Sequence, residues 1–306
     1  MSSTHRHPGF PARPLLRPGV RICRREDGHL QVGLASHLAV VAPDVDEVRQ
    51  LLAGLRNGVP PGPVSSLSPG ALRLCSDLLD RGLVMDADDF FTSVGARRGQ
   101  ESRESLSAFF ADNGSLTRGL LERRRQTAVR VEHRGLPRAG RRLSALLETG
   151  GTGSSVDAQP DLAVLVTRGE TDRDRLDDWV RADLPHLLVS SSEGVVRVGP
   201  FVVPGHTACL RCVDAHHADT DPRRPLILTQ YADPAAPRDG LPDPIHHDLL
   251  DMALLWASRD LLNWIDGKQP TTWSATITLD PTLDLRRAHW AQHPACGCGW
   301  GRRHAV

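Results

Sequence analysis

The first third of the chain alternates between the two-residue period of strands and the longer period of helices. Three short β-type runs lie within residues 20–43, and Asp27-Gly28 between the first two is typical of a tight hairpin. Amphipathic helices are predicted over residues 44–55 and 71–82, and a short apolar run follows them. This order of elements predicts a winged-helix-like module over residues 19–88.

The rest of the chain predicts a second and larger unit of class α/β. Residues 1–18 are rich in Pro and Arg and are expected to form a disordered tail, and residues 89–127 are expected to form a helical linker. From residue 128 to residue 306, apolar strand-like runs alternate with amphipathic helices. Such alternation predicts an open, mostly parallel sheet. The long apolar run over residues 245–265 predicts a helix that serves either the core or an interface.

Composition and charge narrow the classes of function. The 37 basic and 37 acidic residues balance, whereas a generic polyanion binder carries a strong basic excess. Lys268 is the only lysine, so any lysine-dependent chemistry must use that residue. No apolar run approaches the roughly 18–20 residues of a membrane span, and the N-terminus lacks the apolar region of a signal peptide. We therefore expect a cytoplasmic protein that binds neither nucleic acid nor membrane.

The cysteines carry the strongest chemical signal. Six cysteines in 306 residues are too few for a disulfide scaffold. Four of them form two close pairs, CLRC and CGCG, in the order Cys209, Cys212, Cys296 and Cys298. Four thiolates suit one tetrahedral Zn²⁺, and because they leave no open position the zinc is predicted to be structural. The alternative is four unrelated buried or redox thiols. Cys23 and Cys75 are expected to lie in the core of the small module.

The segment after the first α/β strand lacks the glycines of a phosphate-binding loop. Nucleotide-binding α/β domains place G-x-G-x-x-G there, so that the backbone approaches the phosphates at a helix N-terminus. Here His133 and Arg138 occupy the outer positions and only Gly135 remains. A β-carbon at either outer position obstructs the turn or the close approach, so we expect no ATP binding. Asp157 stands where a ribose-binding acid would lie and is interpreted as a vestige or a turn residue.

Arginine-rich segments raise the question of nucleic-acid binding. Eight arginines lie within residues 123–142, against Glu122 and Glu132. A nucleic-acid-binding face is one interpretation, and a solvated helix face beside a subunit interface is the other. The second helix of the small module offers only Arg73 and Arg81 with acidic neighbours, which suits major-groove readout poorly. A winged-helix transcription factor with a zinc-bearing sensor domain is kept as an alternative.

Two segments resemble one known family. The run VGPFVVPGHTACLRCVDAHHADTDPRRP and the closing HPACGCGW are similar to the zinc-binding segments of ThiF-like proteins of azole-containing peptide biosynthesis. The N-terminal module resembles the PqqD-like peptide-recognition element of that family. The resemblance covers residues 20–85 loosely and 128–300 well, and the degraded glycine loop is similar to the Ocin-ThiF subgroup. Arg223-Arg224 stands where the family often has an aromatic residue, which leaves the role of that loop open.

The resemblance implies a Rossmann-type, ubiquitin-activating-enzyme-like domain and a recognition function. Such proteins bind the leader of a ribosomally made precursor peptide and deliver its Cys, Ser and Thr residues to a separate YcaO-type cyclodehydratase. That partner uses ATP to form azolines, and the ThiF-like chain does not adenylate. Homodimerisation through this domain is also implied. The main alternative is an active ThiF-type adenylating enzyme that acts on a peptide or carrier-protein C-terminus.

Strand addition is the expected mode of leader binding. Three short strands leave an exposed edge, to which an extended peptide can add by main-chain hydrogen bonds. The groove is expected between the third strand, His37–Val41, and the second helix, Ala71–Asp80. Alternation places the even and odd strand residues on opposite faces, and which set meets the peptide stays open. The candidate contact residues are His37, Leu38, Ala39, Val40, Val41, Leu72, Leu74 and Leu78.

Overall fold

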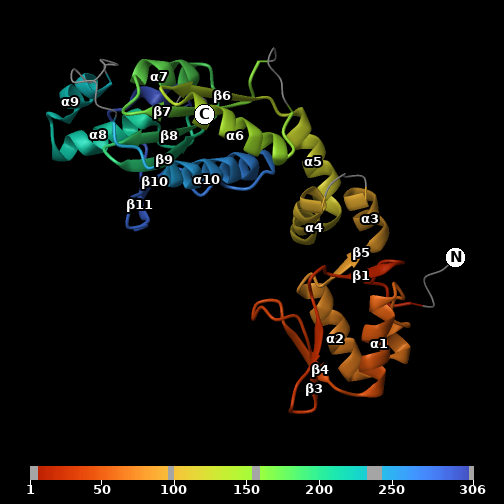
Figure 1. Ribbon diagram of the computed structural model, residues 1–306. Coiled ribbons are helices and arrows are strands. Elements are labelled where there is room, and N and C mark those ends of the chain that lie inside the picture. The colour runs from red at the N-terminus through yellow and green to blue at the C-terminus, as the bar shows by residue number, and fades with distance from the viewer. Residues whose placement is uncertain (1–5, 96–99, 154–158, 233–242, 303–306) are drawn as a thin grey trace. The chain divides into compact units, whose positions relative to one another are not determined.

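The computed structural model describes residues 6–95, 100–153, 159–232 and 243–302 (Figure 1). The chain folds into two compact units, which divide between Gly119 and Leu120. Asp157, which the sequence singled out, lies outside the described residues. None of the described helices has both the length and the apolar character that a membrane crossing needs.

The N-terminal unit combines two small sheets with helices. A three-stranded antiparallel sheet has the order β2-β3-β4, and a two-stranded sheet pairs β1 with β5. The elements in chain order are β1 (Pro14–Leu16), β2 (Ile22–Arg24), β3 (His29–Val32), β4 (Val40–Pro43), α1 (Asp46–Arg56), η1 (Val64–Ser66), α2 (Pro69–Asp80), β5 (Val84–Asp86), α3 (Ala87–Gly95), α4 (Gln100–Asn113) and η2 (Gly114–Leu116). The strands and the first two helices predicted from the sequence are therefore confirmed.

The predicted disordered tail is partly ordered. Phe10 is buried in the core of the N-terminal unit with 3 % of its surface exposed. Leu15 lies opposite Met85 in the β1–β5 pair. The Pro/Arg composition of this segment gave no indication of the buried Phe10 ring or of β1. Strand β1 pairs with the edge of β5. Residues 1–5 lie outside the described residues.

The predicted linker and the predicted place of Cys23 also need correction. Helices α3 and α4 pack against each other within the N-terminal unit, whereas α5 (Thr117–Gln126) belongs mostly to the C-terminal unit. Cys23 is exposed because its side chain points away from the core on β2, while Cys75 is fully buried. Burial raises the pKa of Cys75 to about 11, which keeps that thiol protonated at neutral pH.

The C-terminal unit is built on one six-stranded sheet. Its strand order is β11-β10-β9-β8-β7-β6, so sequential strands are always neighbours. The elements after α5 are β6 (Val129–Arg134), α6 (Pro137–Thr149), β7 (Leu162–Arg168), α7 (Arg173–Arg181), β8 (His186–Ser192), β9 (Val195–Val202), α8 (Leu210–Thr220), α9 (Arg224–Tyr231), α10 (His247–Ile265), β10 (Ala275–Leu279), β11 (Arg286–His289) and η3 (Gly297–Arg302).

The sheet is mixed, which corrects the prediction of a mostly parallel sheet. Strands β6, β7 and β8 are parallel, whereas β9, β10 and β11 each run antiparallel to the strand before them. The first hairpin turns at Glu193 and Gly194, which both have positive φ, as a tight two-residue turn requires. Apolar runs alone do not distinguish a parallel strand from a buried antiparallel one. The sequence therefore did not reveal that β9, β10 and β11 are antiparallel.

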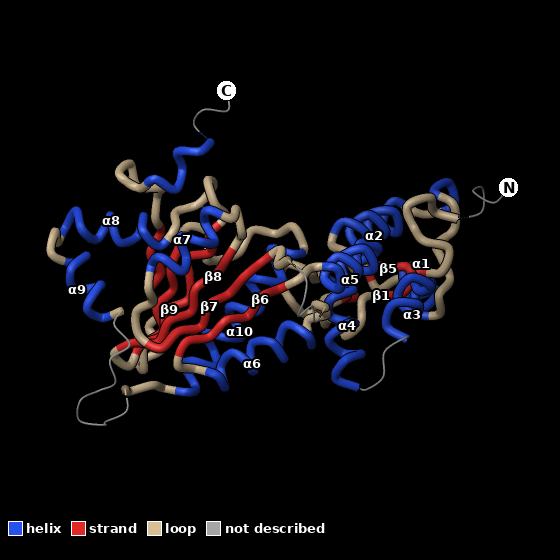
Figure 2. The backbone as a smooth tube through the Cα atoms, turned by 90° about the horizontal axis from the view of Figure 1, so that it is seen from above, coloured by secondary structure: helices blue, strands red, loops and turns tan. Residues whose placement is uncertain are grey.

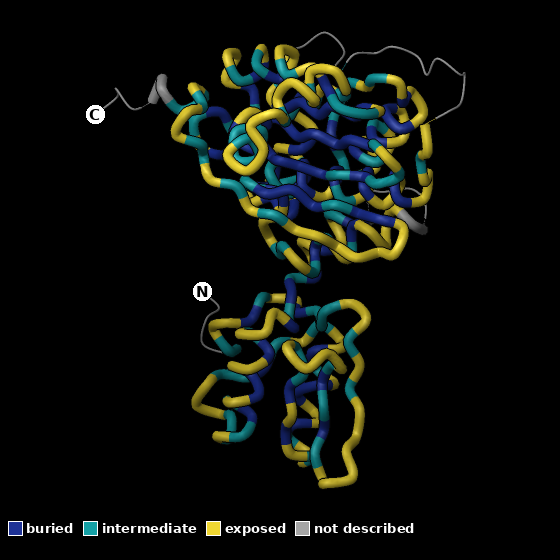
Figure 3. Tube along the Cα trace, turned by 90° about the vertical axis from the view of Figure 1, so that its left-hand side faces the viewer, coloured by how far each residue is buried: buried dark blue, intermediate teal, exposed yellow. Residues whose placement is uncertain are grey.

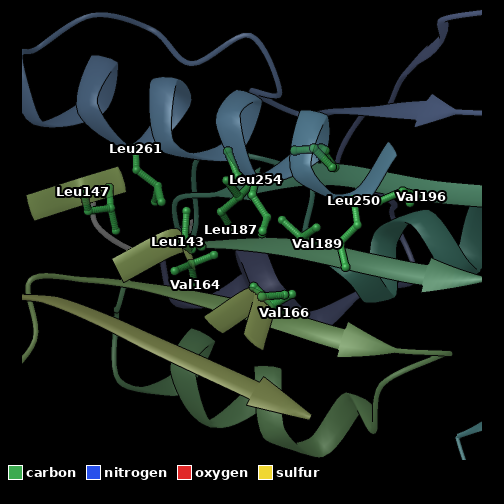
Figure 4. Close-up of a cluster of buried hydrophobic side chains, with 14 of the residues drawn as sticks. Leu143, Leu147, Val164, Val166, Leu187, Val189, Val196, Leu250, Leu254 and Leu261 are labelled. Carbon is green, nitrogen blue, oxygen red and sulfur yellow. The ribbon is translucent and has the colours of Figure 1, made fainter. Parts of the chain in front are cut away.

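Helices cover both faces of the sheet (Figure 2). Helices α6 and α10 pack on one face, where Val164, Leu187 and Val198 meet Leu143 and Leu254 in the largest apolar core (Figure 4). Helices α7 and α8 pack on the other face, against the alternate residues of the same strands. The β-strand period of two thus distributes buried residues to both layers.

The two helical crossovers of this unit have opposite hands. The connections β6–α6–β7 and β7–α7–β8 step across the sheet in the same direction. Their helices nevertheless cover opposite faces, since α6 belongs to one core and α7 to the other. One of the two therefore departs from the right-handed rule for such crossovers. The strand order of the described sheet also shows no reversal, which is where doubly wound folds form their nucleotide crevice.

Candidate metal centre, nucleotide loop and peptide edge

The four predicted metal ligands come together. Cys209 immediately precedes α8 and Cys212 lies in its first turn, whereas Cys296 and Cys298 lie at the start of η3. The Sγ atoms are 3.8 Å apart between Cys209 and Cys212, 3.6 Å between Cys209 and Cys296, and 3.4 Å between Cys212 and Cys298. A tetrahedral ion with bonds of about 2.3 Å spaces its ligands about 3.8 Å apart. The geometry and the donor set fit a metal such as zinc.

Electrostatics within the cluster favour the metal-binding form of two thiols. Hydrogen bonding to the Cys209 thiol is the main cause that lowers the pKa of Cys212, and it lowers the pKa of Cys296 to about 7. The thiolate, not the thiol, is the metal ligand. In the same cluster the pKa of Cys209 and the pKa of Cys298 are raised, so negative charge is distributed unequally among the four sulfurs.

Polar contacts hold the loop before the second cysteine pair against α8. The His293 Nε2 lies 3.1 Å from an Asp219 carboxylate oxygen, and the Cys296 backbone N–H donates to the His293 carbonyl at 2.9 Å. The His216 Nε2 lies 3.0 Å from the Ala291 carbonyl oxygen. Because His216 and Asp219 both belong to α8, these contacts position Cys296 and Cys298 opposite the first pair.

The degenerate loop forms a short turn between β6 and α6. Gly135 has φ +70, and a β-carbon there would lie 3.2 Å from the Arg168 Cβ, so glycine is required at this position. His133 packs against α6, where a β-carbon on Gly140 would lie 2.8 Å from its ring. Helix α6 begins with Pro137, which offers no N–H to an anion. Arg138 is exposed on the first turn of α6.

A cavity of 810 Å³ opens beside the carboxyl ends of the parallel strands. The sequence analysis did not predict this cavity, although the charged residues that follow β7 line it. Its charged walls are balanced, because Arg173 makes two hydrogen bonds to Asp214 at 2.9 and 3.0 Å, and Arg211 lies 2.9 Å from Asp174. Three arginines and three aspartates line the cavity: Arg134, Arg173, Arg211, Asp172, Asp174 and Asp214.

The predicted peptide-binding residues divide into three groups. His37, Leu38 and Ala39 form a turn, because β4 begins only at Val40. Buried side chains belong to the core of the N-terminal unit itself and offer no surface to a ligand: Val40, Leu74 and Leu78. Val41 is 45 % exposed on β4, and Leu72 is half-buried on α2. The apolar pattern on β4 and α2 therefore reflects packing within this core rather than a groove.

Among the described residues, β4 is an edge strand of its sheet, so one side of its backbone has no partner strand. The Asp44 N–H donates to the Gly28 carbonyl at 3.0 Å. Because hydrogen-bonded pairs alternate in antiparallel ladders, Val40 and Ala42 exchange hydrogen bonds with β3. The backbone groups of Val41 therefore face away from β3. Helix α2 packs against β4, and its last turn is tied to the preceding loop by Arg81, which donates to the His37 carbonyl at 3.5 Å.

Comparisons with known proteins place the fold. No protein-family model matches the chain, and no curated protein matches it. The solved structure of the heterocyclase TruD is similar, with a TM-score of 0.62, 17 % identity, and coverage of 94 % of this chain and 43 % of that one. A second heterocyclase structure, with substrate and cofactor, has a TM-score of 0.62, 18 % identity, and coverage of 94 % and 39 %. The chain therefore spans less than half the length of these heterocyclases.

The likeness to MccB covers nearly the whole of both chains. E. coli MccB with AMPCPP and MccA has a TM-score of 0.63, 11 % identity, and coverage of 94 % of this chain and 99 % of that one. E. coli MccB with ATP has a TM-score of 0.61 and 12 % identity. At these identities the comparison concerns the fold. The α/β fold expected from the sequence is confirmed as one that this chain shares with MccB and with the heterocyclase TruD.

Proposed function

We propose that this chain binds the leader of a ribosomally made precursor peptide and presents it to a separate YcaO-type cyclodehydratase. The partner uses ATP to form azolines from Cys, Ser and Thr residues. The observation that carries the proposal is the free edge of β4, where the backbone of Val41 is unpaired by β3. The likeness to the heterocyclase TruD, and to MccB crystallised with MccA, supports the same class of reaction.

Leader binding follows from the physics of the edge. An extended peptide added beside β4 donates to and accepts from the Val41 backbone, and these hydrogen bonds supply affinity without regard to side chains. Val41 projects its exposed side chain from the same strand, and α2 forms the neighbouring wall. Alternate side chains of the peptide then meet different surfaces, which supplies specificity.

The chain is proposed to lack adenylation of its own. The turn keeps only Gly135 of the glycine pattern, and α6 begins at Pro137, which offers no N–H to a phosphate. Arg173 and Arg211, which line the cavity, are already engaged by aspartates. Lys268, the only lysine, follows the C-terminal end of α10, away from the loop after β6 in the chain. The likeness to MccB, which has been solved with ATP and with AMPCPP, favours the alternative of an active adenylating enzyme.

The metal is proposed to be a structural Zn²⁺ held by the four cysteines. Four sulfur ligands complete a tetrahedral shell, so no position is left for water or substrate. Its role is to join the segment around η3 to α8. By the resemblance to ThiF-like proteins, a cytoplasmic homodimer that pairs through the C-terminal unit is also proposed.

Substitution of Val41 tests the peptide edge. Val41→Pro removes the outward N–H without removing a hydrogen bond to β3, and proline is tolerated on edge strands. We expect fluorescently labelled leader peptide to lose at least tenfold in affinity, measured by anisotropy on the full chain. Val41→Thr keeps the backbone donor and serves as the matched control. Unchanged affinity in Val41→Pro would exclude strand addition at β4.

Pyrophosphate release separates the two candidate functions. The proposal expects none when the isolated chain is mixed with ATP and precursor peptide. It expects azoline formation only when a YcaO-type partner is added, measured as the loss of one water mass per ring. Peptide-stimulated pyrophosphate release without the partner would establish the adenylating alternative.

A further inference from the structure

The face of the sheet under α7 and α8 changes from apolar to polar along the strands. Near the beginning of the parallel strands, Ala163, Leu165 and Leu188 pack into the apolar core of this face. Near their carboxyl ends, the register places polar residues of four neighbouring strands side by side on the same face. This row consists of Thr167, Ser190, Arg197 and Thr278. The Thr167 and Ser190 side chains are buried.

A chain of ion pairs starts from Arg197 of the polar row. Arg173 is paired with Asp214 and lies 2.9 Å from Glu170, and Arg197 lies 3.7 Å from the same Glu170. The Arg224 Nε is buried and has no hydrogen-bond partner among the described residues. Arg224 directly precedes Pro225, which lines the same cavity as Arg173 and Asp214.

His217 lies three residues after Asp214 on α8, so the two side chains share one face of that helix. Burial, and then the charges of Arg224 and Arg197, lower the pKa of His217, which keeps the imidazole neutral at pH 7. Its ring lies 5.0 Å from that of Trp290, between centroids. A neutral imidazole adds a hydrogen-bond donor without a further charge.

We propose that Arg197, Arg224 and His217 bind one oxyanion, a carboxylate or a phosphate group. A bound oxyanion accepts the buried N–H of Arg224 and removes the cost of leaving that donor unpaired. Arg173 and Asp214 line both this cluster and the 810 Å³ cavity, so the cavity is the route by which the anion enters. The proposal assigns a role to Arg224 that the sequence left open, and it does not depend on the proposed function.

Two neighbouring arginines provide a matched test. Arg224→Met removes the guanidinium whose Nε is buried and unpaired, and Arg223→Met removes an exposed charge one residue earlier. The probes are sodium acetate and inorganic phosphate, compared with sodium chloride at equal ionic strength. We expect both probes to raise the melting temperature of the wild-type chain and of Arg223→Met. The apparent Kd in Arg224→Met should be at least tenfold weaker.

The outcomes separate binding from a structural role. Acetate as the stronger ligand identifies a carboxylate, and phosphate as the stronger ligand identifies a phosphate group. Without added anion, Arg224→Met should melt no lower than the wild-type chain, because it removes an unpaired buried donor. A lower melting temperature of Arg224→Met without anion contradicts the proposal, as does a response to neither probe or an equal response in all three proteins.

Discussion

The two units of this chain each enclose buried segments (Figure 3), but different kinds of residue stabilise them. In the N-terminal unit the core is apolar, and Leu55, Leu74 and Leu78 are essentially inaccessible. Among the described residues, every buried polar or charged side chain except Thr117 lies in the C-terminal unit. There Asp260, which is fully buried, accepts hydrogen bonds from the backbone N–H groups of Thr271 and Thr272 at 2.8 Å.

The difference separates two kinds of recognition. A small unit with an apolar core has little buried polarity to offer, so its proposed binding site is a strand edge. A larger sheet covered on both faces can bury charges and thiols, because surrounding backbone and side chains satisfy them. The first kind suits any extended peptide, whereas the second requires a ligand of matching charge.

Removal of the metal ligands should have the largest effect. The double change Cys296→Ser and Cys298→Ser is expected to release about one equivalent of metal. Structural zinc contributes about 10–16 kcal/mol of apparent binding free energy, which exceeds the stability of most domains. The C-terminal unit should therefore unfold, as measured by elemental analysis and circular dichroism. Cys23→Ser is the control, and unchanged metal content in the double variant would refute the four-thiolate site.

Loss of a buried ion pair should come next. Arg124 donates from Nε and Nη2 to the Asp266 carboxylate at 2.8 and 2.5 Å, and from Nη1 to the Gly150 carbonyl at 2.7 Å. Arg124→Met leaves Asp266 charged and buried, so the free energy of unfolding should fall by about 3–5 kcal/mol. Urea unfolding measures this effect. Exposed Arg125 pairs with Glu122, and Arg125→Met should cost less than about 1 kcal/mol.

An apolar truncation tests the N-terminal core. Leu74 is 1 % exposed, and Leu74→Ala should lower the free energy of unfolding of this unit by about 2–5 kcal/mol. Half-buried Leu72 is the comparison, and Leu72→Ala should cost less. Weaker leader binding in Leu74→Ala with unchanged stability would mean that Leu74 contacts the peptide directly, contrary to its placement in the core.

The smallest effect concerns pH. Burial lowers the pKa of His186 from 6.5 to about 4, and the imidazole lies 2.9 Å from the Leu184 carbonyl oxygen. Between these values the unfolded chain binds more protons, so stability falls as pH decreases from about 6.5 to 4. For His186 alone, the free energy of unfolding should fall by about 3 kcal/mol over this range, since one pKa unit corresponds to about 1.36 kcal/mol. His186→Gln should remove that part of the pH dependence of urea unfolding.

The sequence predicted the elements of both units because their apolar periods are regular. The hairpin at Asp27-Gly28 is confirmed by the pairing of β2 with β3, and the strand run before residue 168 is confirmed as β7. The sequence also predicted the four-cysteine cluster. Two cysteines close together in the chain, repeated in a second segment, form a pattern typical of a metal site. Periodicity could not place Phe10 or Arg124, since a single buried residue in a polar segment leaves no pattern.

The sequence by itself determined local features. It indicated which segments become strands or helices, where the glycines of a phosphate-binding loop are missing, and which four cysteines form the cluster. Only the tertiary structure decided which apolar residues form core and which face solvent, so that Leu74 is buried while Val41 is exposed. It also decided the direction of β9 and the burial of the unpaired Arg224 Nε. Burial and charge balance depend on contacts between distant segments, and local periodicity carries no information about them.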